Sequence, residues 1–479
     1  MQDPIIAIQD LFKTINHSFW DTIHKIPQSG GDRIYFRIHQ GGQSWIATVS
    51  LNIKENQTFI YFAQHFKAKG LPVPEVLAIN KEGTCYIQED VGTTSLLEVL
   101  EKEGKTDHVF SLFKKSLKSL AELQVKGHQG LDYQKCLTSK LFGNQSIMSD
   151  LLYYKYYFLD SLQYPYDKQA LMNEFELLSD ELASKDFNYF LFRDFQSRNI
   201  MVHNDEVYFI DFQGGMQGGL SYDVASLLWQ AKAELSQEWK DQLLAYYIQE
   251  VNKLLPQALN EAAFRKQYNG FVLLRLLQVL GAYGFRGLFE RKAHFLASIP
   301  LGLNNLKNFL ATTDLKKDTP VFASILQWMV SDEVVARFTP PIANEKTALE
   351  VTIHSFSYKK GIPVDPTDNG GGFVFDMRGI LNPGRFDDYK KLSGLDKPVQ
   401  DFLEQKTKMN VFLNSVWDLV DINVEDYLKR GFSSLQINFG CTGGQHRSVF
   451  AAEQTARHLR NKYKLKVHLS HTNKDNWVK

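Results

Sequence analysis

The segment FLFRDFQSRNIMVHNDEVYFIDF, residues 190–212, carries side chains that suit phosphoryl transfer. Such a reaction needs a carboxylate to orient the attacking hydroxyl, and an amide and a second carboxylate to hold a divalent cation on the phosphates. Asp194 precedes Asn199 by five residues, and Asp211 follows across a tight turn. The spacing predicts that these side chains meet at one edge of a small sheet. The alternative is two acids at hairpin corners, where turn geometry favours Asp.

The residues before this segment predict the elements that would position it. Two strand-like runs within residues 28–53 flank the turn Gly41-Gly42, which predicts an antiparallel hairpin. The segment NQTFIYFAQHFKAKG has the apolar spacing of a helix, and TCYIQEDVG is typical of a strand with an exit turn. The pattern is then mostly helical from about residue 106 to 186, and helices resume from Tyr222 to about 335.

RDFQSRN followed by IDFQ, after a hairpin, a helix and a strand, resembles the aminoglycoside phosphotransferase and choline kinase-like family over residues 20–335. The resemblance implies a two-lobed, protein-kinase-like fold with ATP and Mg²⁺ as cofactors. Asp194 would be the catalytic base, Asn199 and Asp211 would bind magnesium, and Asp223 would support the catalytic loop. The loop over the phosphates would consist of Ser29, Gly30, Gly31 and Asp32. The hinge, whose backbone would pair with adenine, would consist of Gln88, Glu89 and Val91. The glycine pair of the loop is also typical of an ordinary turn.

The match to this family has departures. Phe192 stands where many small-molecule kinases have histidine, and Gln196 where the catalytic loop usually has a basic residue. The strand WIATVS lacks the lysine that binds phosphates, so Ala47, Thr48 and Val49 occupy that region, and Lys54 beyond it is a candidate replacement.

Two functions remain open at this point. The branch of the family that phosphorylates N-acetylmuramate or N-acetylglucosamine at the anomeric hydroxyl also tends to lack the lysine, and its RDF-type loop and YFR strand resemble RDFQ and YFRI here. We therefore predict an amino-sugar kinase whose acceptor pocket involves helices around Arg275, Tyr283 and Arg286. The alternative is a degenerate domain that binds nucleotide as a regulatory scaffold.

A second group of residues, in NFGCTGGQHRSVF, places a glycine-rich loop between a predicted strand and a predicted helix. Unpaired amides at a helix N-terminus, beside Arg447, favour anion binding. Cys441, five intervening residues and Arg447 also have the form of a cysteine-phosphatase loop, in which a thiolate attacks phosphate. Gly440 replaces the usual preceding histidine, so passive anion binding is the preferred interpretation. A structural strand-to-helix turn is the third.

The segments SFSYKKGIP, VFDMRGILNP, LSGLDKPVQDFL and GCTGGQHRS resemble the C-terminal domain of the RNase adapter protein RapZ over residues 350–479. That family implies recognition of a phosphorylated amino sugar, glucosamine-6-phosphate, and in some bacteria a small RNA and a ribonuclease as partners. The phosphate-binding loop would consist of Thr442, Gly443, Gly444, Gln445, His446, Arg447 and Ser448. Asp376, Arg378 and Asn382 would line the same pocket or form a salt-linked strand exit. The adapter's P-loop motif GxxxxGK[ST] is missing, which argues against RNA adaptation, so an RNase or RNA adapter is kept only as the alternative function.

The composition is that of a folded multidomain protein. The chain has 479 residues, and its 54 basic and 54 acidic side chains balance, so no global charge favours nucleic acid or an anionic membrane. Three cysteines without metal-ligand spacing favour a reducing cytoplasm. The N-terminus lacks the positive leader of an export signal, and the apolar stretch 271–289 contains two arginines, which predicts a buried or amphipathic helix and no membrane span. We expect a phosphotransferase domain at 1–338, a proline-containing linker at 339–350 and a small α/β domain at 351–479.

Overall fold

The computed structural model describes residues 4–16, 19–26, 33–183, 188–313, 315, 319–367 and 371–478. The chain forms two compact units, Met1–Phe289 with Leu301–Ser331, and Glu290–Pro300 with Asp332–Lys479.

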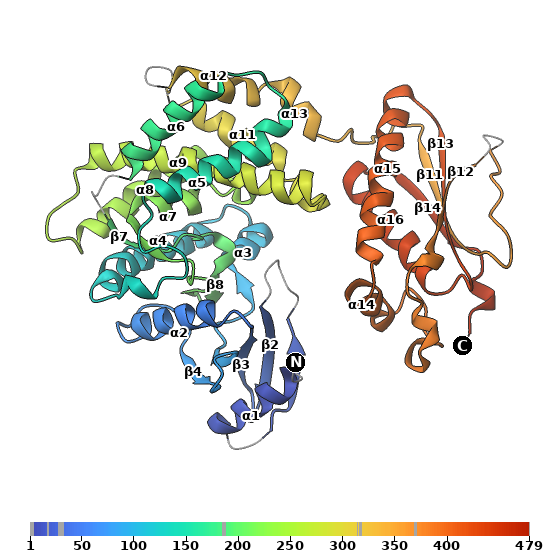
Figure 1. Cartoon of the computed structure of the whole chain (residues 1–479), viewed down its shortest axis with the longest axis horizontal. Helices are drawn as coiled ribbons and strands as arrows, with labels where there is room; N and C mark the ends of the chain where they lie inside the picture. The colour runs from blue at the N-terminus through green and yellow to red at the C-terminus, as the bar shows by residue number, and fades with distance from the viewer. Residues whose placement is uncertain are drawn as a thin grey trace. The chain divides into compact units, whose positions relative to one another are not determined.

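The first unit begins with a five-stranded antiparallel sheet in the order β1-β2-β3-β5-β4 (Figure 1). Gly41 and Gly42 join β2 to β3 with φ values of 55° and 81°. Two successive positive φ values are typical of a type I′ turn, so the predicted hairpin is confirmed. One face packs on α1, where Phe36 and Ile38 are buried, and α2 contacts the other face through Phe59 and Tyr86. The elements are α1 (Pro4–Asn16), β1 (Thr22–Lys25), β2 (Ile34–Gln40), β3 (Gln43–Val49), α2 (Ile53–Lys67), β4 (Val76–Ile79) and β5 (Cys85–Glu89).

A larger helical lobe follows, and it carries two small sheets, β6-β8-β9 and β10-β7. Asn204 and Asp205, with φ values of 52° and 59°, form the tight turn between β8 and β9 that the sequence predicts. The elements are β6 (Thr94–Ser95), α3 (Leu96–Glu103), α4 (Asp107–His128), η1 (Tyr133–Lys135), α5 (Asn144–Tyr154), the π-helix η2 (Lys155–Leu159), η3 (Asp160–Leu162), α6 (Lys168–Leu182), β7 (Asn188–Leu191), η4 (Ser197–Asn199), β8 (Ile200–His203), β9 (Glu206–Phe209), β10 (Met216–Gly219), α7 (Ser221–Leu228), η5 (Ala231–Ala233), α8 (Gln237–Asn252), α9 (Glu261–Tyr283), the π-helix η6 (Gly284–Phe289), α11 (Ile299–Leu310) and α12 (Pro320–Met329).

The strand β10 is an element that sequence patterns did not indicate, because QGGMQGG has the composition of a loop. Glycines just before and within β10 are required by close packing: a Cβ on Gly215 would lie 2.4 Å from the ring of Phe190, and one on Gly218 would lie 2.5 Å from Leu191. Bare backbone at these positions lets β10 pair with β7 while the side chains of β7 fill the space.

One helix of this unit is long and apolar enough to cross a membrane by length and composition alone. It spans Glu261–Phe289, and 61% of its most apolar window is buried inside the structure. That burial agrees with the predicted buried helix at 271–289, since a core helix of a soluble fold has the same composition.

The second unit contains a parallel four-stranded sheet in the order β12-β13-β11-β14, with α15 and α16 on one side of it (Figure 1). Alternate residues of the central strands, such as Val351, Ile353 and Ile437, are buried in its core. The predicted two-lobed fold followed by a small α/β domain is confirmed. The elements are α10 (Ala293–Leu296), α13 (Asp332–Phe338), β11 (Glu350–Ser357), β12 (Gly372–Asp376), η7 (Met377–Gly379), η8 (Pro383–Arg385), η9 (Asp387–Tyr389), α14 (Lys397–Lys406), α15 (Met409–Arg430), β13 (Ser434–Cys441), α16 (Arg447–Tyr463), β14 (Lys466–His471) and η10 (Lys474–Asn476).

Candidate functional site

The structure brings Asp194, Asn199 and Asp211 together at the ends of short strands. Asn199 Nδ2 donates to the carbonyl of Asp194 at 2.9 Å and to its Oδ2 at 3.3 Å. Across the β8–β9 hairpin, the backbone N–H of Ile210 donates to the carbonyl of Asn199 at 3.0 Å, which places Asp211 next to Asn199. A carboxylate, an amide and a second carboxylate therefore share one edge, as the five-residue spacing predicted.

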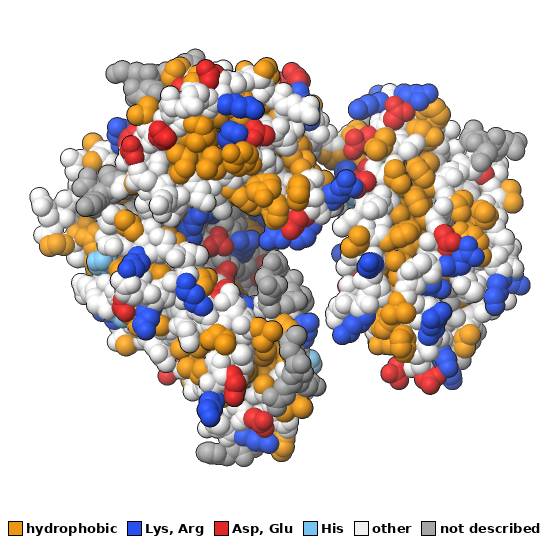
Figure 2. All heavy atoms as spheres, in the orientation of Figure 1, with side chains coloured by type: hydrophobic (Ala, Val, Ile, Leu, Met, Phe, Trp, Pro, Cys, Tyr) orange, Lys and Arg blue, Asp and Glu red, His pale blue; other side chains and the backbone are white. Residues whose placement is uncertain are grey.

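Two arginines face the carboxylate of Asp194. Arg198 Nη2 lies 3.1 Å from Oδ2, and Arg275 Nη2 lies 3.9 Å from Oδ1. Arg275 is buried in α9 and also donates to the hydroxyl of Tyr222 at 3.1 Å. Arg198, two residues after Gln196, thus places a basic group beside Asp194. Figure 2 shows a hollow in this unit where acidic and basic side chains gather.

Asp211 is held by its own segment in a conformation suited to a ligand. Its φ of 69° lies in the left-handed region, and its Oδ1 accepts a hydrogen bond from Gln213 Nε2 at 2.7 Å. The next residue, Phe212, stacks on Phe59 of α2 with ring centroids 4.7 Å apart. Among the described residues no donor contacts Asp211 Oδ2 or Asn199 Oδ1, so two oxygens remain for a cation.

The loop that carries Asp194 is anchored by Asp223. This carboxylate has no solvent exposure and accepts from the backbone N–H groups of Phe192 at 2.7 Å and Arg193 at 3.0 Å, and from Gln124 Nε2 at 3.1 Å. Burial raises the pKa of the Asp223 carboxyl to about 7, and these three hydrogen bonds act against the increase. Arg193, one residue before Asp194, has φ of 82° and forms an ion pair with Asp150 at 2.7 Å. The loop conformation therefore depends on buried polar contacts.

The predicted adenine hinge follows β5. The side chain of Gln88 is buried, and the carboxylate of Glu89 accepts from Lys67 Nζ at 2.8 Å. Both side chains are therefore packed or paired within the protein. No acceptor within the described part of the chain contacts the N–H of Val91, which leaves a backbone donor of the kind that pairs with adenine. The predicted phosphate loop, Ser29 to Asp32, lies outside the described residues.

The strand that lacks a lysine is β3. Ala47 is buried on the face of the sheet that packs on α1. Thr48 is buried on the opposite face, where its partner in the neighbouring strand β5 is Tyr86. Lys54, expected as a replacement, is exposed at the start of α2 and forms no ion pair among the described side chains. The neighbouring Glu55 instead contacts Arg33, whose Nη2 lies 3.1 Å from Oε1. Arg33 lies outside the motifs that predict the site from the sequence.

In the second unit, the glycine-rich loop connects β13 to α16. Cys441 is buried; its Sγ lies 3.1 Å from Ser448 Oγ and accepts from the N–H of Gly444 at 3.2 Å. Thr442 and Gly443 are exposed, whereas the residues from Gly444 to Ser448 are buried. The thiol is therefore enclosed by its own loop.

Side chains at the end of this loop contact backbone carbonyls. Gln445 Nε2 donates to Leu392 at 2.8 Å, His446 Nε2 contacts the carbonyl of Tyr389 at 2.9 Å, and Arg447 Nη1 donates to the carbonyls of Arg378 and Ile380 at 3.0 and 2.8 Å. Burial lowers the pKa of Arg447, and no partner among the described residues contacts its Nε.

The three residues predicted beside this loop follow β12. Asp376 and Arg378 form an ion pair at 2.7 Å, and the guanidinium of Arg378 lies 4.0 Å from the ring centre of Tyr358. Asn382 caps η8 by accepting from the N–H of Gly384 at 3.2 Å. The ion pair predicted at the end of this strand is thus present. Because Arg447 donates to the carbonyls of Arg378 and Ile380, the ion pair lies beside the glycine-rich loop.

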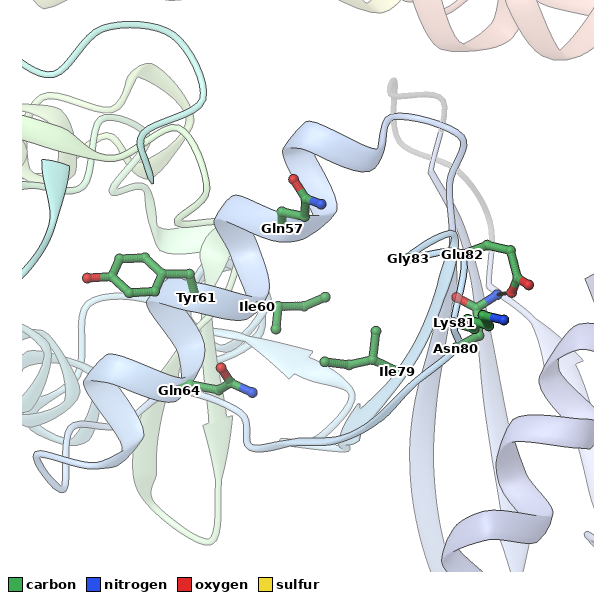
Figure 3. A pocket seen from close by; sticks show the side chains of 9 residues that line it. All are labelled: Gln57, Ile60, Tyr61, Gln64, Ile79, Asn80, Lys81, Glu82 and Gly83. Carbon is green, nitrogen blue, oxygen red and sulfur yellow. Dashed lines mark hydrogen bonds between the residues drawn. The ribbon is translucent and has the colours of Figure 1, made fainter. Parts of the chain in front are cut away.

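A pocket of about 290 Å³ lies between α2 and the β4–β5 turn (Figure 3). It is lined by Gln57 and Gln64 of the helix and by residues 79–83 of the turn. At helical periodicity these glutamines lie on a different face of α2 from Glu55 and Phe59. The pocket is therefore separate from the edge that carries Asp211.

Two family models match the chain. The phosphotransferase enzyme family matches residues 22–259, and the RapZ C-terminal domain matches residues 349–475. The chain therefore carries a segment that matches the phosphotransferase enzyme family, followed by one that matches the RapZ C-terminal domain.

Curated relatives match part of the chain. A nucleotide-binding protein of Shewanella halifaxensis is 38% identical over 127 residues, which are 26% of this chain and 43% of that protein. A nucleotide-binding protein of Bacillus cereus is 35% identical over 188 residues, which are 38% of this chain and 60% of that protein. The chain thus spans about half the length of the curated relatives it matches.

Solved structures similar to the chain are small-molecule phosphotransferases. An apo aminoglycoside phosphotransferase has 16% identity, covers 64% of this chain and 98% of that chain, and has a TM-score of 0.42. The choline kinase of Streptococcus pneumoniae has 14% identity, covers 64% and 99%, and has a TM-score of 0.42. An amicoumacin kinase in complex with AMP-PNP, Ca²⁺ and its ligand has 13% identity, covers 70% and 96%, and has a TM-score of 0.43.

Proposed function

We propose that this protein is an ATP-dependent kinase that phosphorylates a hydroxyl of an amino sugar of the N-acetylmuramate or N-acetylglucosamine type. The observation that carries the proposal is the shared edge of Asp194, Asn199 and Asp211, anchored by Asp223 inside a phosphotransferase-family domain. Positioning and electrostatic stabilisation account for most of the catalysis of phosphoryl transfer, and this edge offers both.

Asp194 would accept the proton of the sugar hydroxyl as the γ-phosphate is transferred. Its hydrogen bond from Asn199 Nδ2 fixes the orientation of the carboxylate, and Arg198 and Arg275 place positive charge beside it. These arginines would also attract the negative phosphate that approaches the acceptor.

Asn199 Oδ1 and Asp211 Oδ2 would hold Mg²⁺. Both are hard oxygen donors without a hydrogen-bond donor nearby in the described residues, which suits this ion together with phosphate oxygens. When bound, the ion supplies charge neutralisation on the phosphates. Gln213 would keep Asp211 in place through its hydrogen bond to Oδ1.

The amino-sugar acceptor is supported by the resemblance of RDFQ and YFRI to the anomeric sugar kinases. We further propose that the loop Thr442 to Ser448 binds the phosphate of an amino-sugar phosphate, and that this ligand adjusts kinase output in the cytoplasm. The exposure of residues Thr442 and Gly443 supports the anion site, while Gln445 and His446 maintain the loop. A kinase whose rate ignores added glucosamine-6-phosphate would contradict the coupling.

The test is ATP consumption by the full chain with Mg²⁺, screened against N-acetylmuramate, N-acetylglucosamine, other amino sugars, choline and an aminoglycoside. Phosphorus NMR of the product would locate the new phosphate. Asp194→Asn should lower turnover by about 10²–10⁴-fold while ATP still binds, because the base is lost and the nucleotide contacts remain. Asp205→Asn, at an exposed turn of the same segment, is the matched control and should retain turnover. Full activity of Asp194→Asn would refute the assignment of the base.

A nucleotide-binding scaffold for an RNA or ribonuclease partner is the second candidate. The absence of a lysine in β3 favours it, and the name nucleotide-binding protein of the curated relatives agrees with it. ATP binding without turnover on any acceptor would establish this second function and reject the first.

A further inference from the structure

The cation expected in a kinase-like nucleotide site lies on β3, pairs with a glutamate of the following helix and binds phosphate oxygens. Here β3 has the apolar and hydroxyl side chains Ile46, Ala47 and Thr48 in this region. The glutamate is nevertheless present as Glu55 in the first turn of α2. Its partner is Arg33, which precedes β2 and reaches Glu55 Oε1 with Nη2 at 3.1 Å.

Two routes of contact place the guanidinium of Arg33 beside the metal-binding edge. In the first, Glu55 Oε1 accepts from Gln213 Nε2 at 3.4 Å, and the same nitrogen donates to Asp211 Oδ1 at 2.7 Å. In the second, the guanidinium lies 5.7 Å from the ring centre of Phe59, which stacks on Phe212, the neighbour of Asp211. Both routes end at the same residue pair.

The strand register explains how the side chain of the residue just before β2 reaches this place. Ile34 pairs with Val49 and Tyr35 with Thr48, so Arg33 lies near the end of β3, on the face of the sheet that carries Tyr35 and contacts α2. Only 7% of Arg33 is exposed, so the charge is held in a fixed position. A guanidinium has five donors in a planar fork and can bind a carboxylate and a phosphate at the same time.

We propose that Arg33 is the phosphate-binding cation of the nucleotide site and replaces the lysine that β3 lacks. This inference rests on the proposed function, because it assumes that ATP occupies the cleft. Arg33 binds the α- and β-phosphate oxygens, and Glu55 orients it, as a lysine and glutamate pair would do from β3.

The experiment is calorimetric titration of the full chain with ATP, ADP and adenosine in the presence of Mg²⁺. Arg33→Met should weaken ATP and ADP binding by about 10- to 100-fold, the effect of losing a charge-assisted hydrogen bond. Adenosine binding should be unchanged, because adenosine has no phosphate, and this also shows that the variant is folded. Arg33→Lys should lose less than Arg33→Met. In the double variant Arg33→Met/Glu55→Gln, removal of the uncompensated carboxylate should recover part of the affinity.

Lys54→Met is the matched control, since Lys54 is the other basic residue near the start of α2 and is exposed. It should bind all three ligands as the wild type does. Equal ATP binding by Arg33→Met and wild type, or loss of binding in Lys54→Met alone, would overturn the assignment of Arg33. A parallel loss of adenosine binding in Arg33→Met and Arg33→Lys would assign Arg33 a structural role and overturn it too. A wild-type protein that binds neither ATP nor ADP would reject the proposed function itself.

Discussion

Replacement of Asp223 tests whether one buried carboxylate holds the catalytic loop. Its Oδ2 accepts from the N–H of Phe192 and from Gln124, and its Oδ1 accepts from the N–H of Arg193. Asp223→Ala removes both acceptor oxygens, which accept three hydrogen bonds, and leaves buried donors unsatisfied. A buried donor without a partner costs about 1–3 kcal/mol, so we expect a loss of roughly 3–5 kcal/mol in the free energy of unfolding.

Asp223→Asn tests how much of the free energy of unfolding depends on a single hydrogen bond of this carboxylate. The amide retains one oxygen, which can keep the two bonds at the Oδ2 position, and places an NH₂ group against the N–H of Arg193. One hydrogen bond is lost, so the expected cost is about 1–3 kcal/mol. Turnover should fall in both variants, and more in Asp223→Ala, because Asp194 directly follows Arg193.

The assay is urea unfolding of the full chain, combined with hydrogen–deuterium exchange of the peptide that contains Phe192 and Arg193. Exchange there should accelerate most in Asp223→Ala. Asp167→Ala is the control: Asp167 also accepts from two backbone N–H groups, but at the exposed start of α6, where loss of a cap costs about 1 kcal/mol. Equal losses in Asp223→Ala and Asp167→Ala, with unchanged exchange, would refute the reasoning.

The pH dependence of stability gives a further check on Asp223. A carboxyl whose pKa is about 7 in the folded protein and 3.8 in its ordinary state stabilises the fold most below pH 3.8, and this contribution is lost as the pH rises through 7. Asparagine does not titrate. The stability of the wild type relative to Asp223→Asn should therefore fall between pH 4 and pH 7, and a constant difference would contradict the pKa.

Three other predictions follow from buried positions. Gly215→Ala should destabilise the first domain by about 1–3 kcal/mol in urea unfolding, because the new Cβ would lie 2.4 Å from the ring of Phe190. Cys441→Ser should hydrolyse p-nitrophenyl phosphate at the same rate as the wild type; loss of a measurable wild-type rate would revive the phosphatase interpretation. Burial lowers the pKa of Lys240, beside Trp229, to about 8 from 10.5, so the fold loses stability as the pH falls through 8. Lys240→Met should accordingly be stabilising at pH 7 and less so at pH 10 when unfolding is compared at both values.

Much of the fold follows from local patterns in the sequence. The turns Gly41-Gly42 and Asn204-Asp205 need backbone with positive φ, and the residues there supply it, so both hairpins are predictable. The C-terminal strands, such as Ser434–Cys441 and Lys466–His471, alternate apolar and polar residues and are separated by helices, which is typical of a small α/β layer. The strand β10 is not predictable from local patterns, because the glycines at and before it are required by packing against Phe190 and Leu191, which belong to another segment of the chain.

The candidate site divides in the same way. The spacing of Asp194 and Asn199 is local, and a single loop brings them together. The contacts of Arg275 with Asp194, and of Arg193 with Asp150, join residues that are far apart in the chain, so motif spacing cannot indicate them. In the C-terminal loop, the sequence suggests that all polar side chains face a ligand, whereas Gln445 and His446 use theirs to support the loop.

The missing lysine illustrates why a motif and a charge are different things. The family motif specifies a lysine at one sequence position of β3. A bound phosphate requires only that some positive group lies near it in space. The register of β2 and β3 lets Arg33 reach Glu55, which keeps the helix glutamate paired even though β3 has no cation. Arg33 is buried and Glu55 is half-buried, and holding such a charged pair costs free energy that an apolar pair would not. The pair beside Asp211 therefore favours a nucleotide site, and turnover is the measurement that separates a kinase from a nucleotide-binding scaffold.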